Sequence, residues 1–449
     1  MSASLFRRTA ALAAVILLVL TVGSCDGAGA GAKLDSNHGA NLALFQTVMK
    51  EVERTYVEKV AERKLVQDAL KGMLSRLDPH SGYLDERQYK EMMSVTRGRF
   101  GGIGIELTLA AGVPQVISPI EGTPAAAAGI EPGDIILAID GAPTSGMDAD
   151  EIVKRLRGAV GTKVKLLIGR KGKPRFTVTL TRAIIHVVSV KASLEPGKIG
   201  YVRLTSFVEN TPSELRAAIT RLKRQAGGHL RGFILDLRNN PGGLLDSAVA
   251  VAGDFLDGGT VVTTRGRTED DDRTYRAAPS GDMLPGVPVV VLINSASASA
   301  SEIVAGALQD QGRATIMGTR SFGKGSVQTI MPLDGEGALR LTTALYYTPS
   351  GRSIQDRGIE PNIVVSLPKN EQVANAFVSH ERDLYGAFKN TGPLSGTAKK
   401  PKIALSRSSG REQHPIKPML IGTKNDAQLK AAVNYLEGKE VTEKRANRG

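Results

Sequence analysis

The sequence predicts an α+β protein of several domains, with a helical N-terminal region, a small β-rich domain, a mixed α/β layered core and a C-terminal helix. Three patterns support this fold class. Apolar residues recur at helical spacing in residues 37–96, short alternating strands between Gly and Pro turns fill residues 97–183, and strands alternate with helical segments in residues 184–390. The length of 449 residues suggests two to four domains, and a hydrophobic content of 41% is ample for folded cores.

The composition excludes several classes of function. The net charge of +13 favours weak attraction to anionic lipid or nucleic acid, but no nucleic-acid-binding motif is present, so we expect no nucleic-acid partner. Much of the excess charge lies in residues 391–423, whose Lys-, Pro- and Ser-rich sequence is typical of a linker or insertion. No Cys/His cluster has the spacing of a zinc site, so we expect no metal and no cofactor.

Residues 1–30 have the pattern of a targeting segment. Two arginines precede the apolar run at 10–22, which has the length of a signal-peptide core and is too short for an ordinary spanning helix. The run ends in VGSC, which resembles a bacterial lipobox and makes Cys25, the only cysteine, a lipidation candidate. Two alternatives to lipidation remain open: conventional cleavage among the small residues that follow, and retention of the segment as an uncleaved anchor. Each fate exports the protein to the periplasm, with inner-membrane association through residues 1–25 where lipid or anchor is retained.

The predicted helices of residues 37–96 are interrupted by a turn-rich break, LDPHSGYLD, at residues 77–85. Asp78 and His80 in this break are residue types that perform catalysis. A structural turn is the better interpretation of both.

The β-rich segment at 97–183 contains features of a peptide-binding groove. FGGIGIEL is a Gly-rich loop entering a strand, where successive backbone N–H groups can hold a carboxylate and the strand edge can pair with an extended peptide. Residues 97–183 resemble a PDZ domain, and the resemblance implies that the helical segment at 148–158, which ends at the long cation Arg157, forms the other wall of the groove. It also implies that the carboxylate contacts are five consecutive residues, Gly101, Gly102, Ile103, Gly104 and Ile105.

The segment from 287 to 328 carries the predicted chemistry. The apolar run VPVVVLI reads as a buried strand, the small residues NSASASASE follow, and IVAGALQD then reads as a helix. A Ser at such a junction has free backbone N–H groups and the positive end of the helix dipole beside it, which suits a nucleophile whose reaction develops an oxyanion. The residue chemistry alone does not choose among four serines, Ser295, Ser297, Ser299 and Ser301.

The predicted base is a lysine, because none of the six histidines lies in this segment. Lys324 stands between two glycines that allow close backbone approach, which helps to desolvate the amine and lower its pKa. Gln328 follows four residues later, a spacing that puts it on the same face as Lys324 in a helix or a strand. Its amide oxygen would then accept a hydrogen bond from the amine.

These segments resemble the carboxyl-terminal processing proteases, or tail-specific proteases, which are Ser/Lys peptidases with a PDZ domain. The resemblance implies that Ser299 is the nucleophile, Lys324 the base and Gln328 the residue that positions the base. The family usually has Gly where this chain has Ala296. The resemblance also implies that residues 97–183 form the PDZ domain, that residues 184–390 form a layered catalytic domain of the crotonase/Clp-like kind, and that the LDPHS break takes no part in catalysis.

Further site assignments follow from the same resemblance. The RNNPGG element at 238–243 is expected to face the nucleophile, so that the N–H groups of Gly242 or Gly243, with that of Ala300, form an oxyanion hole. A plain turn remains an alternative for the two glycines. Arg157 is expected to couple tail recognition to activity, with a surface arginine at a helix end as the alternative.

The expected function is an endopeptidase that binds the exposed C-termini of extracytoplasmic proteins and cleaves them. Residues 424–449 add a final helix, expected to pack onto the body. A homo-oligomer and an adaptor or lipoprotein partner remain open. Three rival functions are a non-catalytic PDZ adaptor, a PDZ-bearing Ser-His-Asp protease and an acyl-CoA enzyme of similar architecture.

Overall fold

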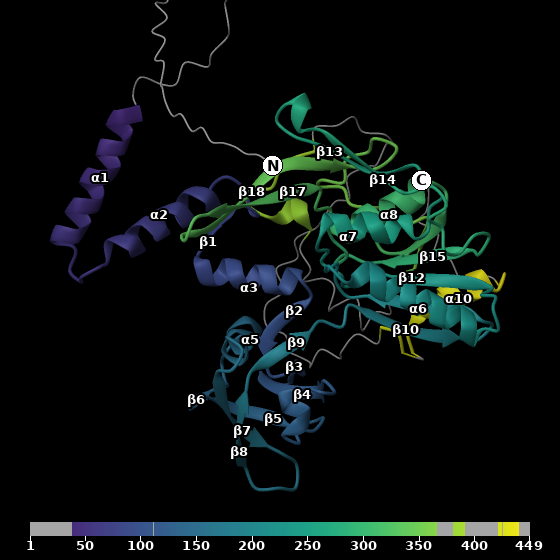
Figure 1. Ribbon diagram of the computed structural model, residues 1–449, viewed down its shortest axis with the longest axis horizontal. Helices are drawn as coiled ribbons and strands as arrows, with labels where there is room; N and C mark the ends of the chain where they lie inside the picture. Colours follow the sequence, from purple (N-terminus) through teal and green to yellow (C-terminus); the bar gives the residue numbers. More distant parts are fainter. Residues whose placement is uncertain (1–37, 111, 366–379, 391–420, 424, 440–449) are drawn as a thin grey trace, which may run out of the picture. The chain divides into compact units, whose positions relative to one another are not determined.

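The computed structural model describes residues 38–110, 112–365, 380–390, 421–423 and 425–439 (Figure 1). The chain divides into two compact units, residues 1–66 and residues 67–449. The first unit contains helix α1 (His38–Thr55), and helix α2 (Glu62–Ser75) begins in the first unit and ends in the second. The predicted targeting segment and almost all of the predicted linker lie outside the described residues. Within the described ranges, no helix is long and apolar enough to cross a membrane.

The larger unit contains a six-stranded sheet in the order β10-β11-β12-β15-β16-β19. Its strands are β10 (Val190–Glu195), β11 (Ile199–Leu204), β12 (Gly232–Asp236), β15 (Val289–Ile293), β16 (Ala314–Gly318) and β19 (Ile363–Val364). The edge strand β10 is antiparallel to β11, and the other neighbours are parallel. The predicted alternation of strands with helices is confirmed by α6 (Thr211–Gln225), α7 (Leu245–Gly253) and α8 (Ala300–Asp310).

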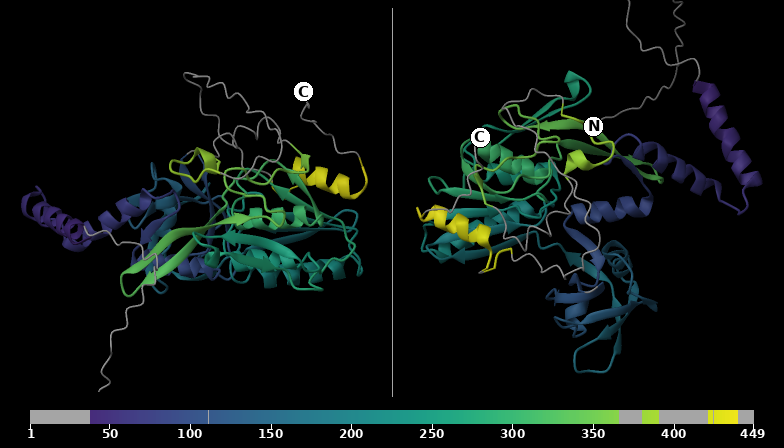
Figure 2. Two further views of the ribbon diagram at one scale, coloured as in Figure 1. Left: turned by 90° about the horizontal axis from the view of Figure 1, so that it is seen from above. Right: turned by 180° about the vertical axis from the view of Figure 1, so that it is seen from behind.

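Both faces of this sheet are covered, which explains the unbroken apolar run of β15. Val289, Val291 and Ile293 pack in the core that includes α6, α7 and α8. Val290 and Leu292 point to the other face and pack with the C-terminal helix α10 (Ala427–Leu436). Figure 2 shows α10 in yellow on the opposite side of the sheet from the teal and green helices.

A second sheet of five strands includes a contribution from the turn-rich break before the β-rich domain. Its strands are β1 (Gly82–Leu84), β13 (Thr260–Arg265), β14 (Arg273–Arg276), β17 (Ser326–Leu333) and β18 (Gly337–Tyr347). Strand β1 pairs antiparallel with β18, and helix α3 (Glu86–Thr96) follows it. The segment that leads into the β-rich domain therefore belongs to the body of the catalytic region, which the sequence analysis did not predict. Two short 3-10 helices, η1 (Glu269–Asp271) and η2 (Glu381–Asp383), complete the described elements of this region.

The β-rich domain is closed by pairing of β2 (Arg99–Gly102) with β9 (Ala183–His186). Between them lies a sheet in the order β3-β4-β5-β7-β8, with β6 on β5. These strands are β3 (Ile105–Ala110), β4 (Val113–Pro119), β5 (Ile135–Ile139), β6 (Ala142–Pro143), β7 (Lys163–Gly169) and β8 (Phe176–Thr181), and the helices are α4 (Pro124–Ala127) and α5 (Ala149–Leu156). Strand β3 is at an edge of the sheet, and the domain has a hydrophobic core of its own.

Candidate active site

Ser299 lies at the turn between strand β15 and helix α8 and immediately precedes the helix. Its backbone has φ 54° and ψ −114°, in the left-handed half of conformational space that residues other than Gly rarely adopt. Such a conformation costs on the order of 1–3 kcal/mol and persists where the surroundings impose it, often at active sites. The residue is partly exposed, while the helix it precedes is buried.

The neighbouring serines have different roles. Ser297 donates a hydrogen bond to Leu237 O at 2.8 Å and accepts one from the Asn294 N–H at 3.0 Å. Ser301 donates to Asn240 O at 2.9 Å. Both side chains are fully buried, so their hydroxyls are fixed in the fold. Since Ser297 and Ser301 are engaged in this way, the geometry favours Ser299 over them.

Glu302 joins the nucleophile turn to the loop that carries Lys324. Its Oε2 accepts hydrogen bonds from the backbone N–H groups of Ser299 at 2.8 Å and Lys324 at 2.9 Å. Its Oε1 accepts from Ser321 Oγ at 2.5 Å and the Gly323 N–H at 2.7 Å. Burial raises the pKa of Glu302 to about 7, and the four hydrogen bonds act against that rise. Because one oxygen binds both N–H groups, the backbones of Ser299 and Lys324 are neighbours.

Glu302 was missed by the sequence analysis, although a signal for it exists. A Glu three residues after a Ser at a helix start is the pattern of a capping box, in which the carboxylate accepts from the N–H of the first residue. The bond from the Ser299 N–H to Glu302 is of this kind.

Lys324 lies in the loop between β16 and β17 and is partly buried. Burial lowers the pKa of its amine, Arg340 acts in the same direction, and the carboxylates of Glu381, Glu302 and Asp78 oppose them, with a lowered pKa as the net result. Within the described part of the chain, Lys324 Nζ makes no hydrogen bond to Ser299 or to another group. The lowered pKa makes the neutral form, which a general base requires, more accessible than in a lysine exposed to water.

Gln328 lies in β17, but Lys324 precedes that strand, and a register shift separates Val327 from Gln328. The expectation that a spacing of four puts Lys324 and Gln328 on one face of a single element is therefore wrong. The amide nitrogen of Gln328 donates to Ser326 Oγ at 3.0 Å and Thr342 Oγ1 at 3.2 Å. Among the described residues no donor binds its amide oxygen, which leaves that oxygen as an acceptor.

The RNNPGG turn lies against the nucleophile. A Cβ atom at Gly242, whose φ is +102°, would be 2.9 Å from both Ala300 N and Ser299 Cβ, so only Gly fits there. The Gly242 N–H donates to Asn240 Oδ1 at 2.9 Å, so it is already engaged. The prediction of Gly242 as an oxyanion donor is corrected accordingly. The N–H groups of Gly243 and Ala300 have no hydrogen-bond partner among the described residues, so these two remain the candidate pair.

A buried guanidinium fixes the start of this turn. Arg238 is 1% exposed and binds Asp236 at the end of β12 and Asp426 at the N-terminus of α10, with shortest distances of 2.6 Å to each. Burial alone would raise the pKa of Asp426, but its hydrogen bonds to Arg238 and the charge of that residue lower it. The C-terminal helix is thereby tied to the element that faces Ser299.

The LDPHS break also contributes to the site, which makes its interpretation as a plain turn incomplete. The Asp78 carboxylate accepts from the N–H groups of His80 and Ser81 at 2.8 Å and from Thr342 Oγ1 at 3.1 Å. His80 Nε2 lies 2.9 Å from Glu381, which is 301 residues away in sequence. Sequence patterns carry no signal for a pair at that separation.

Comparison with known proteins identifies the family. A model of peptidase family S41 matches residues 198–365, a PDZ domain model matches residues 115–170, and a model of the activating protease CtpB N-terminal domain matches residues 25–88. The carboxy-terminal-processing protease of Bartonella bacilliformis is 46% identical to this chain over 413 residues, which are 91% of each chain. The chain belongs to the carboxy-terminal processing proteases.

Other members of the family are similar over most of this chain. Carboxy-terminal processing protease CtpA of Bacillus subtilis is 34% identical over 361 residues, 80% of this chain and 76% of that protein. Among solved structures, the photosystem II D1 C-terminal processing protease is 30% identical with a TM-score of 0.43, over 77% of this chain and 98% of the other. As a carboxy-terminal processing protease, the protein is a serine peptidase with a PDZ domain, which excludes the adaptor and acyl-CoA alternatives.

In the PDZ domain of this carboxy-terminal processing protease, strand β3 lies at an edge of the sheet, where a peptide strand can be added. Gly101 and Gly102 belong to β2 and pair with β9, so their backbone is partly engaged. The N–H groups of Ile103 and Gly104 donate to no other described residue. Of the five predicted carboxylate contacts, Ile103, Gly104 and the first residue of β3, Ile105, are therefore the best placed.

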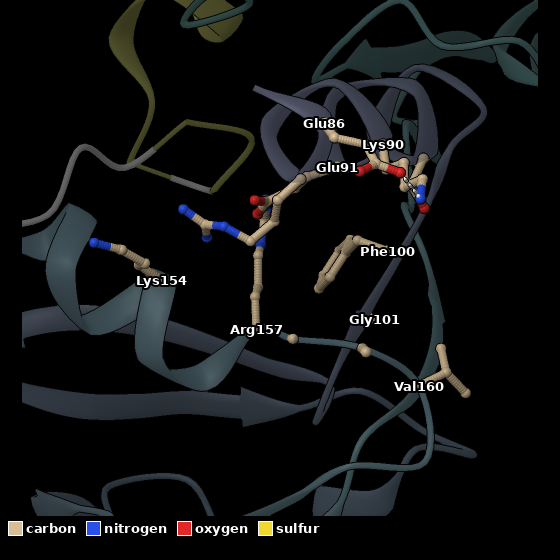
Figure 3. A pocket seen from close by; sticks show the side chains of 12 residues that line it. Glu86, Lys90, Glu91, Phe100, Gly101, Lys154, Arg157 and Val160 are labelled. Carbon is tan, nitrogen blue, oxygen red and sulfur yellow. Dashed lines mark hydrogen bonds and ion pairs between the residues drawn. The ribbon is translucent and has the colours of Figure 1, made fainter. Parts of the chain in front are cut away.

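Arg157 is the residue that ends α5 and lines a cavity of about 490 Å³ between α3 and the PDZ domain (Figure 3). Its guanidinium carbon lies 4.3 Å from the centre of the Phe100 ring, and its Nη1 lies 3.9 Å from a carboxylate oxygen of Glu91 in α3. Among the described residues, the ion pair and the ring contact of Arg157 are made with α3 and β2, not with residues 184–390.

Proposed function

We propose that Ser299 and Lys324 are the nucleophile and the general base of this carboxy-terminal processing protease. The observation that carries the proposal is the bridge through Glu302, whose one oxygen binds the N–H groups of both residues beside the strained backbone of Ser299. The lowered pKa of the partly buried Lys324 amine supports the assignment of the base.

In the proposed mechanism, neutral Lys324 takes the proton from Ser299 Oγ as the oxygen attacks the scissile carbonyl carbon. The N–H groups of Gly243 and Ala300 stabilise the resulting oxyanion. The tetrahedral intermediate collapses when the Lys324 ammonium gives its proton to the leaving amine. Water, deprotonated by the same lysine, then attacks the acyl-enzyme and frees Ser299. The amide oxygen of Gln328 holds the amine in line.

The PDZ domain implies that the protease binds the C-termini of its protein substrates. We propose that the terminal carboxylate binds the N–H groups at Ile103 and Gly104 while the tail pairs with the edge of β3. We further propose that Arg157, whose Nη1 lies 3.9 Å from a carboxylate oxygen of Glu91 in α3, couples tail binding to activity.

We propose an extracytoplasmic location, supported by the apolar run at 10–22 and by the VGSC sequence that ends at Cys25. The test is cell fractionation together with metabolic labelling by a fatty acid. Label on the wild type that is lost in Cys25→Ser supports lipidation, and export without label supports conventional cleavage or an anchor. Activity confined to the cytoplasmic fraction would overturn the proposal.

The test of the catalytic assignment uses the purified chain and an unfolded substrate with an apolar C-terminal tail. Ser299→Ala and Lys324→Ala should each abolish cleavage while leaving tail affinity unchanged, because neither residue touches the PDZ groove. Gln328→Ala should lower kcat and leave KM close to that of the wild type. Substantial cleavage by Lys324→Ala would refute the assignment of the base.

A further inference from the structure

Glu381 is a buried carboxylate behind the loop that carries Lys324. It lies in the 3-10 helix η2, and its side chain is 0% exposed. His80 Nε2 lies 2.9 Å from each of its two oxygens, and Gln355 Nε2 donates to Oε1 at 3.1 Å. A carboxylate removed from water is stable when its oxygens are bonded in this way.

The same group is connected to both sides of Lys324. The Glu381 N–H donates to Phe322 O at 3.2 Å, two residues before the lysine. Gln355, which donates to the Glu381 carboxylate, accepts the Gly325 N–H at 2.8 Å, one residue after the lysine. Displacement of Glu381 therefore moves the loop on either side of the base.

Charge gives a second connection. Glu381 is the strongest of the charges that oppose the effect of burial on the pKa of Lys324, ahead of Glu302 and Asp78, whereas Arg340 acts in the same direction as burial. The other titratable groups near Glu381 are His80, Asp356 and Asp383. A buried negative charge close to an amine favours the ammonium form, and the low local dielectric strengthens that preference.

We propose that Glu381 is a positioning residue for Lys324. Glu381 holds the base loop in place, and it thereby sets the pH above which the base is neutral and the protease is active. The inference rests on the proposed role of Lys324 as the base. Glu381 does not itself transfer a proton, because His80 and Gln355 occupy its oxygens.

The test is the pH profile of kcat/KM between about pH 5 and 9 for three forms of the full chain: wild type, Glu381→Asp and Glu381→Gln. Removal of the negative charge destabilises the ammonium form of Lys324, so the acid limb should move to lower pH. The shift should be larger for Glu381→Gln than for Glu381→Asp, which keeps the charge but withdraws it from the loop. At a pH on the acid limb, each protein's activity is expressed as a fraction of its own plateau activity. This fraction should be about threefold or more higher for Glu381→Gln than for the wild type.

Asp383→Asn is the matched control, since Asp383 is in the same short helix but exposed, where solvent screens its charge. Its acid limb should coincide with that of the wild type. A purely structural role for Glu381 predicts reduced activity at every pH with an unmoved limb, and that result would overturn the inference. If Glu381→Gln does not fold, as judged by thermal unfolding of the full chain, the smaller shift in Glu381→Asp decides the question.

Failure of the inference is distinguishable from failure of the proposed function. Inactive Lys324→Ala together with an unmoved acid limb in both Glu381 variants would leave Lys324 as the base and reject the role of Glu381. Active Lys324→Ala would reject the proposed function itself.

Discussion

Ser299 has a backbone conformation that only local restraints can hold, and Glu302 supplies the main one. The Glu302 carboxylate is fully buried and accepts four hydrogen bonds. Two come from the backbone N–H groups of Ser299 and Lys324, and two come from Ser321 and Gly323, just before the lysine. Oxygen acceptors are required at both positions, because three of the four donors are backbone N–H groups that cannot reverse their role. The geometry of the reacting pair thus depends on a residue that takes no part in the proposed chemistry.

Replacement of Glu302 by Gln should lower kcat about 10²-fold, since small displacements of a reacting group have effects of this size. An amide puts its N–H₂ group against at least one backbone N–H donor, that of Gly323 or those of Ser299 and Lys324, which displaces the base loop from the nucleophile turn. Steady-state kinetics on a tailed substrate checks this result. Glu360→Gln, at an exposed carboxylate, is the control and should behave as wild type. A Glu302→Gln enzyme with wild-type kcat would contradict this role of the carboxylate.

At the scale of elements, the PDZ groove depends on the turn between β2 and β3. Gly104 in this turn has φ +77°, and a Cβ atom there would lie 2.3 Å from the Thr123 side chain. Thr123 in turn donates a hydrogen bond to Ile120 O at 2.6 Å and so is itself fixed. Position 104 of the turn therefore has no room for a side chain.

Gly104→Ala should weaken binding of a C-terminal peptide at least tenfold or so, a loss of about 1.4 kcal/mol, because the carboxylate contacts are displaced. Titration calorimetry in a Ser299→Ala background measures the affinity without cleavage. Gly122→Ala is a matched control, since Gly122 has φ +75° but nothing within 4 Å of an added Cβ atom. Equal affinity of the Gly104 and Gly122 variants would show that backbone strain alone, not the contact with Thr123, governs the effect.

At the scale of the whole molecule, one buried carboxylate outside the active site makes stability depend on pH. Burial raises the pKa of Asp254 to about 6, although Arg216 Nε donates to it at 2.7 Å and opposes the rise. In the unfolded chain the pKa of an Asp is about 3.9. Because the folded form binds the proton more tightly, this contribution to stability is present at low pH and is lost as the pH rises through about 6.

Asp254→Asn removes that titration, so its thermal midpoint should fall less than that of the wild type between about pH 4.5 and 7. Scanning calorimetry at a series of pH values gives the comparison. Asp246→Asn, an exposed position on the same helix α7, should follow the wild-type curve. Parallel curves for wild type and Asp254→Asn would show that Asp254 is ionised in the folded protein over this whole range.

Much of the architecture could be predicted from the sequence because its signals are local. A pattern within about ten residues predicts each of three features: the buried strand β15, the helix after it and the Gly-rich entrance to β3. The supports of the base could not be predicted in this way. His80, Thr342 and Glu381 come from three distant segments and meet only in the folded chain. The misjudged relation of Lys324 and Gln328 has a local cause, a register shift in β17 that periodicity does not reveal.

The central claim is that an uncharged lysine amine takes the proton of one serine hydroxyl. Covalent labelling by a fluorophosphonate, followed by intact-mass and peptide mapping of wild type and Lys324→Ala, tests it most directly. The account predicts a single adduct on Ser299, whose rate of formation rises with pH in the wild type and falls about 10²-fold or more in Lys324→Ala. An adduct on another serine, or equal labelling rates in the two proteins, would contradict it.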